Sequence, residues 1–511
     1  MDQLVGRAPA PLSLVRKIAL NTSLLTSGRF FITVSGFVGT AAITRYLGQG
    51  AFGSLAAGLA FVSIALNLGD VGLFIVATRE VARNPDDERR LLANTFGLAV
   101  AISLSAMVLC LGLMFLIYPG ADGAQTRTAI AVLLVQLLVA APGGVALVHY
   151  NVRQQALPLS AAATASSFVF LAALFVVIAL DGSFGFVAAT YTLGAFVTAL
   201  VPVFLARREI PLRPARDREL WRRMIRAALP QSAVLIVGTV YFRLDLILVS
   251  VLSSSTETAL YGLGYKVIES LLWLPGLLMF TLFPELARED VGSRRLRELI
   301  QTAFSSVQLI VLPLVVLLVG FAPEIVHVVT GGGYVGAATV LRLLAVSMVL
   351  GYFNVVFGLS MASLGEQRRL LRVLLASLAM NIALNAVLIP LDGARGAAIA
   401  LVSSEVLGVA LGLLVYRDLG MVPRVYRLRE TVIVVVAMSL VPVLLALVDA
   451  TDWLGRVGVL LLGGVCVLAV YVVGLFLLRA VPADAERAFR RLLGGSREPV
   501  PEPPEQDPPT A

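Results

Sequence analysis

Long apolar stretches separated by short polar links run through almost the whole chain. The stretches are roughly 20 to 28 residues long and cover 19–43, 53–78, 91–118, 128–150, 157–180, 184–206, 228–252, 259–283, 299–321, 337–364, 370–391, 396–416, 431–448 and 457–478. Each can cross a hydrocarbon layer of about 30 Å as an α-helix, which satisfies its own backbone polar groups in lipid. The pattern predicts an all-α polytopic membrane protein with 14 transmembrane helices. With 58% hydrophobic residues, a water-soluble globular chain is excluded.

Positive charges divide the links into two alternating sets. Most of the 40 Lys and Arg residues lie in one set and at the chain ends, whereas the other set holds only Arg45, Arg127, Arg395 and Arg456. Lys and Arg accumulate on the cytoplasmic side of membrane proteins. We therefore expect a bacterial plasma (inner) membrane protein with both termini in the cytoplasm. The same bias explains the net charge of +8 without a nucleic-acid partner.

Two sequence matches about 205 to 211 residues apart indicate an internal repeat. Residues 78–83 resemble 283–288, and residues 181–189 resemble 392–400. Six helices per repeat is an even number, so both halves face the same way, as in transporters that place a substrate path between two lobes. The predicted domains are a six-helix lobe (1–206), a cytoplasmic linker with a surface-lying amphipathic helix (207–227), a second six-helix lobe (228–417), two additional transmembrane helices (418–479) and a largely disordered cytoplasmic tail (480–511).

Charged residues inside the apolar stretches are the candidate substrate-cavity residues. They are Arg29, Asp70, Arg243, Asp245, Lys266, Glu269 and Glu405. A cation deep in the membrane costs about 2.5 to 3.5 kcal/mol on insertion scales unless it meets water or a partner. Arg29 shares one helix face with several threonines, which favours a hydrated cavity between the lobes. Lys266 and Glu269 are three residues apart, so a local ion pair is the alternative explanation for both.

Two questions about these residues stay open from the sequence alone. Arg243 and Asp245 are two positions apart on one helix and face different surroundings, so either of them could face the cavity. Asp70 and Glu405 need a partner, a proton or an ion. Cys110 and Cys466 fall in separate spans far apart in sequence, and the chain has only two histidines. We therefore predict no disulfide, no metal site and no cofactor.

Short motifs resemble those of a known family over roughly residues 21–416. They are TRYLG at 44–48 followed by FG at 52–53, LGDVGL at 68–73, and LDLIL at 244–248 before ALY at 259–261. In this order and spacing they resemble the polysaccharide-exporter branch of the multidrug/oligosaccharidyl-lipid/polysaccharide flippase superfamily. The resemblance implies two lobes around a cationic cavity that flips a polyprenyl-diphosphate-linked sugar. The branch that flips the peptidoglycan precursor has an Arg-Asp pair mid-way along its first helix, where Ser35 and Gly36 stand here.

The leading hypothesis is a flippase, not an enzyme, that moves a polyprenyl-diphosphate-linked oligosaccharide from the cytoplasmic to the outer leaflet. Arg29, Arg243 and Lys266 would attract the diphosphate while the isoprenoid stays in lipid. The alternatives are a multidrug or cation antiporter of the same superfamily and a non-transporting scaffold for glycan assembly. Coupling to protons or sodium ions, and association with glycan-assembly proteins, are left open.

Overall fold

The computed structural model describes residues 14–211, 213–423, 428–447 and 453–478, and no β-strand occurs within these ranges. The predicted tail, 480–511, lies outside them. In chain order the elements are α1 (Leu14–Asp70), α2 (Leu73–Arg83), the 3-10 helix η1 (Pro85–Asp87), α3 (Glu88–Ile117), α4 (Ala124–Leu134), α5 (Leu137–Val152), α6 (Leu157–Ala179), α7 (Phe184–Leu205), α8 (Arg218–Leu252), α9 (Ser255–Glu269), α10 (Leu274–Leu286), α11 (Arg294–Gly320), α12 (Ala322–Thr330), α13 (Ala337–Ser363), α14 (Gln367–Asp418), α15 (Leu428–Leu447) and α16 (Trp453–Leu477).

Fourteen predicted spans are present in the described chain, although helices and spans do not match one to one. Helix α14 covers two spans and α1 covers the first span and most of the second: α1 turns back at Gly48 and α14 turns back at Asp392 and Gly393, where the backbone leaves helical geometry. Three spans are instead broken into two helices: the second at α1 and α2, the fourth at α4 and α5, and the eighth at α9 and α10. The prediction of an all-α membrane protein with 14 transmembrane helices is confirmed.

Glycine makes the break in the second span sterically feasible. Val71 and Gly72 both have positive φ, 46° and 65°, between the end of α1 and the start of α2. A left-handed conformation costs glycine little, so Gly72 adopts it readily, whereas Val71, which carries a β-carbon, adopts it at a cost. The Asp70 side chain accepts a hydrogen bond from the Phe74 amide at 3.3 Å, which satisfies one of the free N–H groups at the start of α2.

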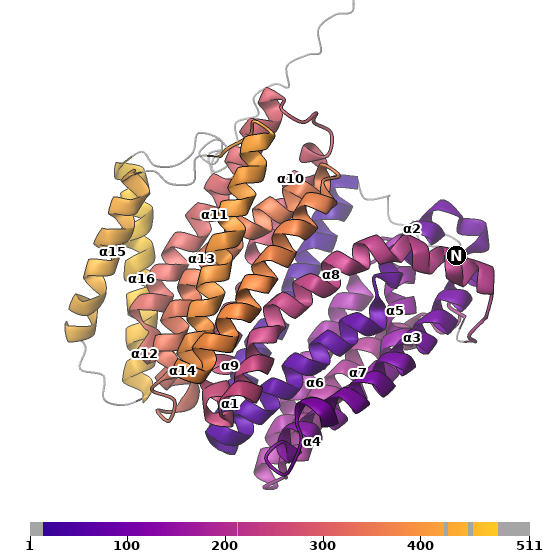
Figure 1. Cartoon of the computed structure of the whole chain (residues 1–511), viewed down its shortest axis with the longest axis horizontal. Coiled ribbons are helices and arrows are strands. Elements are labelled where there is room, and N and C mark those ends of the chain that lie inside the picture. The colour runs from indigo at the N-terminus through magenta and orange to yellow at the C-terminus, as the bar shows by residue number, and fades with distance from the viewer. Residues whose placement is uncertain (1–13, 212, 424–427, 448–452, 479–511) are drawn as a thin grey trace, which may run out of the picture.

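Two groups of helices lie side by side in the molecule (Figure 1). Helices α1–α7 form one group, which we call the N-terminal half, and α9–α14 form the other, the C-terminal half. Helix α1 packs against α6 in its own half and against α9 in the other. Helix α8 runs diagonally between the halves, and α15 and α16 pack on the far side against α11 and α12.

Apolar side chains remain exposed on the outward faces of the outer helices. Examples are Val108 and Leu116 on α3 and Leu461 and Val465 on α16, each more than three-fifths exposed. Such a surface would be unstable in water but suits contact with lipid tails. The exposure pattern agrees with the lipid-facing surface of a polytopic membrane protein.

The predicted surface-lying linker helix is part of α8 and packs against the protein. Helix α8 runs without interruption from Arg218 into the seventh span. Leu220 and Met224, which form the apolar stripe, are buried in a cluster with Leu91 of α3 and Val81 of α2. The apolar stripe of α8 therefore packs over the ends of α2 and α3, because those ends also present apolar side chains.

The Asp217 side chain caps the N-terminus of α8. It accepts hydrogen bonds from the amides of Glu219 and Leu220, at 3.1 and 3.2 Å, and pairs with Arg90 at 2.8 Å. The Arg90 guanidinium, with these amides, holds the pKa of Asp217 below its usual value of 3.8. The stabilisation is thus present above pH 3.8 and is lost as the pH falls through the lower pKa of the folded state.

We expect Asp217→Ala to lower the midpoint of thermal unfolding at pH 7, because the first turn of α8 loses its cap and its ion pair. Asp217→Asn is the control, since asparagine also caps helices and keeps the protein closer to the parent. The difference between Asp217→Ala and the parent should shrink as the pH is lowered below 3.8. Equal midpoints for the alanine variant and the parent at pH 7 would contradict this role.

Candidate functional site

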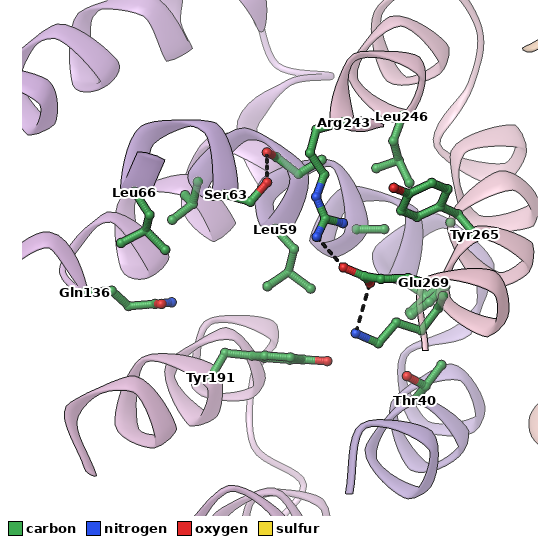
Figure 2. Close-up of a pocket in the computed structure, with 16 residues that line it drawn as sticks. Thr40, Leu59, Ser63, Leu66, Gln136, Tyr191, Arg243, Leu246, Tyr265 and Glu269 are labelled. Carbon is green, nitrogen blue, oxygen red and sulfur yellow. Dashed lines mark hydrogen bonds and ion pairs between the residues drawn. The ribbon is translucent and has the colours of Figure 1, made fainter. Parts of the chain in front are cut away.

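A cavity lies between the two halves at the level of the middle of α8. One part, of about 260 Å³, is lined from the N-terminal half by α1, Gln136 and Tyr191 and from the other side by α8 and α9. A second part, of about 450 Å³, is lined by α1, α8, α9 and α13. Both parts share Ser63, Arg243, Tyr265 and Glu269, so we treat them as one central cavity. Figure 2 shows Arg243 and Glu269 on one side of it and Gln136 and Tyr191 on the other.

Two basic side chains share one carboxylate in the wall of the central cavity. Arg243 is hydrogen-bonded to Glu269 Oε1, and Lys266 Nζ lies 3.4 Å from Glu269 Oε2. The Arg243 guanidinium also lies over the Tyr265 ring, 5.6 Å from its centre. All three charged side chains keep between a quarter and two-fifths of their surface exposed. The cluster therefore presents one net positive charge to the cavity.

The last turn of α9 and the interior of α8 position this cluster. Lys266 and Glu269 occupy the last turn of α9, which stops at Glu269 before α10 begins. Lysine at the C-terminus of a helix is favourable because the free carbonyls there carry negative charge. The expected local pair of Lys266 and Glu269 does form, but Glu269 is shared with Arg243, so the pair is only part of the arrangement.

The structure resolves which face of α8 meets the cavity. Arg243 lines it, whereas Asp245 points into the C-terminal half and is 1% exposed. The Asp245 carboxylate accepts hydrogen bonds from Tyr261 at 2.8 Å and from Asn385 at 2.6 Å. Asp245 therefore does not reach the central cavity, because α9 and α14 cover it.

Asp245 and Glu405 belong to one buried polar network in the C-terminal half. Glu405 is 3% exposed and accepts hydrogen bonds from Asn354 at 2.5 Å and from Tyr241 at 3.1 Å. The network consists of Tyr241, Asp245, Tyr261, Asn354, Asn381, Asn385, Ser404 and Glu405. Buried acids require such donors, since an unpaired buried charge is costly. The network joins α8, α9, α13 and α14.

Arg29 lies on the same helical face of α1 as Gly36 and Thr40, but it lines neither part of the central cavity. Thr40 lines the central cavity, and a side-chain carbon at Gly36 would lie 3.8 Å from Lys266 Cε. Arg29 lies two turns toward the N-terminus from Gly36. Its side chain is exposed and makes no hydrogen bond or ion pair with another described residue. Arg29 is thus separate from the Arg243 cluster, and Asp70, the cap of α2, lines none of the cavities described above.

Sequence reasoning did not single out the polar wall of the N-terminal half. Gln136 and Tyr191 face the cavity from this half. Gln136 interrupts the apolar run 129–141 and lies at the break between α4 and α5. A single amide side chain within an apolar run was the feature of the sequence that could have identified this part of the cavity wall. Asn385 was not singled out from the sequence either, because its contact with Asp245 depends on how α14 lies against α8.

A family model described as polysaccharide biosynthesis protein matches residues 18–289, which is more than half of the chain. The chain belongs to the polysaccharide biosynthesis protein family. The family membership confirms the resemblance that the motifs at 44–48, 68–73 and 244–248 indicated, and the matched region includes the whole Arg243 cluster.

Several individual proteins of known name or structure are also similar to this chain, at low sequence identity. Over 165 residues it is 24% identical to the probable low-salt glycan biosynthesis flippase Agl15 of Haloferax volcanii, and the match spans 32% of this chain and about a third (35%) of that relative. Among solved structures, the lipid II flippase MurJ in an inward closed conformation aligns with a TM-score of 0.69 at 12% identity, covering 93% of this chain and 99% of MurJ. An inward-facing multidrug resistance MATE transporter aligns with a TM-score of 0.56 at 18% identity, covering 79% and 98%. These two likenesses show the fold.

Proposed function

We propose that this member of the polysaccharide biosynthesis family is a flippase for a polyprenyl-diphosphate-linked oligosaccharide. The observation that carries the proposal is the net-cationic cluster of Arg243, Lys266 and Glu269 in a cavity between two helical halves. Family membership, the similarity to the probable glycan biosynthesis flippase Agl15 and the MurJ-like fold support it. The cavity wall offers groups that can position an anion and a sugar. Translocation of such a substrate breaks no covalent bond, so we propose a transporter and not an enzyme.

The proposed mechanism uses the charge cluster to attract the diphosphate. A diphosphate accepts charge-assisted hydrogen bonds from a guanidinium and an ammonium group. Ser63, Gln136 and Tyr191 would replace water around the first sugars. Arg29 would meet the headgroup nearer the cytoplasmic side. The substrate would favour whichever arrangement of the halves completes these contacts, which gives alternating access.

Contacts between the halves close the predicted outer side. Arg45 donates a hydrogen bond to the Val328 carbonyl at 2.6 Å, and Tyr334 donates one to the Thr44 carbonyl at 3.4 Å. Trp453 of α16 also donates to Val328, at 3.0 Å, and its ring lies against the Arg45 guanidinium. A cavity closed on this side supports loading from the cytoplasm and a cytoplasmic-to-outer direction of transport.

The buried polar network is the proposed place for ion coupling. Asp245 and Glu405 lie apart from the substrate cluster, yet Tyr241 lies on α8 only two residues from Arg243. A proton or sodium ion taken up by these acids would change their hydrogen bonds and so the position of α8.

Deletion of the gene tests the proposed function directly. The lipid-linked glycan should accumulate in the cytoplasmic leaflet of the inner membrane, where an impermeant sugar-oxidising reagent added to spheroplasts does not reach it. Complementation with the parent gene should restore its reaction. If the deletion strain exposes as much lipid-linked glycan as the parent strain, the flippase proposal fails.

A multidrug or cation antiporter is the second candidate function. The MATE-like fold and the buried acids Asp245 and Glu405 favour it. Drug susceptibility that rises in the deletion strain without any change in glycan would support this candidate. A non-transporting scaffold is tested with Arg29→Ala, since a scaffold should keep glycan export when this variant is present in the membrane at the parental level.

A further inference from the structure

An apolar pocket lies inside the C-terminal half, next to the central cavity. It has a volume of about 400 Å³ and is bounded by α8, α13 and α14. Its apolar wall includes Val234, Phe242, Leu359, Val373 and Leu374. This volume falls within the range of about 300 to 1,000 Å³ that is common for pockets holding small ligands. The mechanism described above makes no use of it.

The apolar pocket is continuous with the cationic cavity. Val234, Gly238, Phe242 and Val355 line both spaces, so no helix separates them. Phe242 faces the apolar pocket, and the next residue, Arg243, holds Glu269 in the cavity. The two spaces together match a ligand with an anionic head joined directly to an apolar chain.

Three of the four polar side chains in the pocket wall, Tyr241, Asn354 and Glu405, bond to one another, whereas the fourth, Ser377, has a buried hydroxyl oxygen with no hydrogen-bond partner among the described residues. Glu405 receives hydrogen bonds from Asn354 and Tyr241, and all three belong to the buried network. Because these three groups are satisfied by one another, an apolar chain can lie beside them without leaving any of the three unpaired. The remaining wall favours apolar contact through the hydrophobic effect.

We propose that the apolar pocket binds the first isoprene units of the polyprenyl chain, those attached to the diphosphate. This inference rests on the proposed function. A diphosphate on Arg243 and Lys266 brings the first carbons of its chain to the shared wall at Gly238 and Phe242. The rest of the chain lies in lipid. The pocket would thereby select an allylic polyprenyl diphosphate over a soluble sugar diphosphate.

The test compares two diphosphates of different chain length, isopentenyl diphosphate with one isoprene unit and farnesyl diphosphate with three. Their binding is measured with the full chain in lipid nanodiscs, and empty nanodiscs provide the correction for partition into lipid. Farnesyl diphosphate should bind about tenfold more tightly or better, a gain that needs burial of only about two methylene groups. Arg243→Ala should weaken both ligands.

Gly238→Leu fills the shared wall and separates the pocket from the charge cluster. A β-carbon at Gly238 meets no atom within 4 Å, so the side chain has room to enter the pocket without displacing a helix. We expect the preference for farnesyl over isopentenyl diphosphate to disappear, whereas inorganic diphosphate, which carries no chain, should bind with an affinity within about twofold of the parent. The matched control is Gly464→Leu in α16, whose β-carbon also meets no atom within 4 Å.

Three results would overturn the proposal in different ways. If isopentenyl diphosphate binds in an Arg243-dependent manner but farnesyl diphosphate binds no better, a membrane acyl chain or nothing occupies the pocket, and the flippase proposal stands without it. If neither diphosphate binds to the parent protein, the anion site of the proposed function fails, and the tail pocket fails with it. An equal loss of preference in Gly464→Leu would also contradict the proposal.

Discussion

Arg243→Ala should reduce glycan export by about 100-fold, corresponding to roughly 3 kcal/mol of lost interaction with the diphosphate. The variant leaves Lys266 paired with Glu269, so the cavity wall loses its net positive charge. It also removes the planar donor that can hold two phosphate oxygens at once. The measurement is the rate at which lipid-linked glycan reaches the outer leaflet in a deletion strain that carries the variant.

A second variant distinguishes the loss of positive charge from general damage to the fold. The double variant Arg243→Ala with Glu269→Ala keeps Lys266 unpaired and restores one net positive charge, so it should export more than Arg243→Ala alone. Arg342→Ala is the matched control. Arg342 also lies in a transmembrane helix, but it lines neither space and donates a hydrogen bond to the Val319 carbonyl at 3.1 Å. Export at the parental level in Arg243→Ala would refute the role of the cluster.

Gly53→Leu should open the outer side of the molecule and stop export. A β-carbon at Gly53 would lie 1.8 Å from the carbonyl oxygen of Ser255 and 3.1 Å from the amide nitrogen of Ala259. Both atoms belong to the backbone of the other half, so no rotamer change can relieve the clash. Overpacking of this kind costs about 1 to 3 kcal/mol, enough to shift a conformational equilibrium about 5- to 150-fold.

The opening can be measured with a thiol crosslinker across the outer contact. Gln49→Cys and Gly333→Cys are introduced in a background in which Cys110 and Cys466 are replaced by serine, since Gln49 donates a hydrogen bond to the Gly333 carbonyl. Crosslinking should be efficient in this background and fall sharply when Gly53→Leu is added.

Gly50→Leu is the control for the outer contact. It lies three residues away, and its β-carbon would meet no atom within 4 Å. This variant should keep both crosslinking and export. If Gly53→Leu crosslinks as well as the control and exports at its rate, close packing at this position does not hold the outer side closed.

Local patterns were sufficient to predict the spans and several charged groups at the site. A lipid-crossing helix must be apolar over about 20 residues whatever its neighbours are, so each span is visible without the fold. Arg243, Lys266 and Glu269 could be picked out for the same reason, because charge inside such a span is rare and demands water or a partner.

Other features depended on contacts between distant segments. The linker helix was expected on the membrane surface, yet Leu220 and Met224 pack against α2 and α3, since a stripe of apolar residues fits lipid and protein equally well. The pairing of Asn385 with Asp245 joins residues of α14 and α8 that no local periodicity relates. The apolar pocket likewise arises only where α8, α13 and α14 meet.

By itself the sequence determined that this is a 14-span helical membrane protein with charge buried at defined positions, because hydrophobic length and the cost of intramembrane charge are properties of each segment alone. Only the tertiary structure decided that Arg243 faces the cavity while Asp245 is covered, and that Glu269 serves two cations. A helix has several faces, and the partner of each face is set by packing against helices far away in the chain.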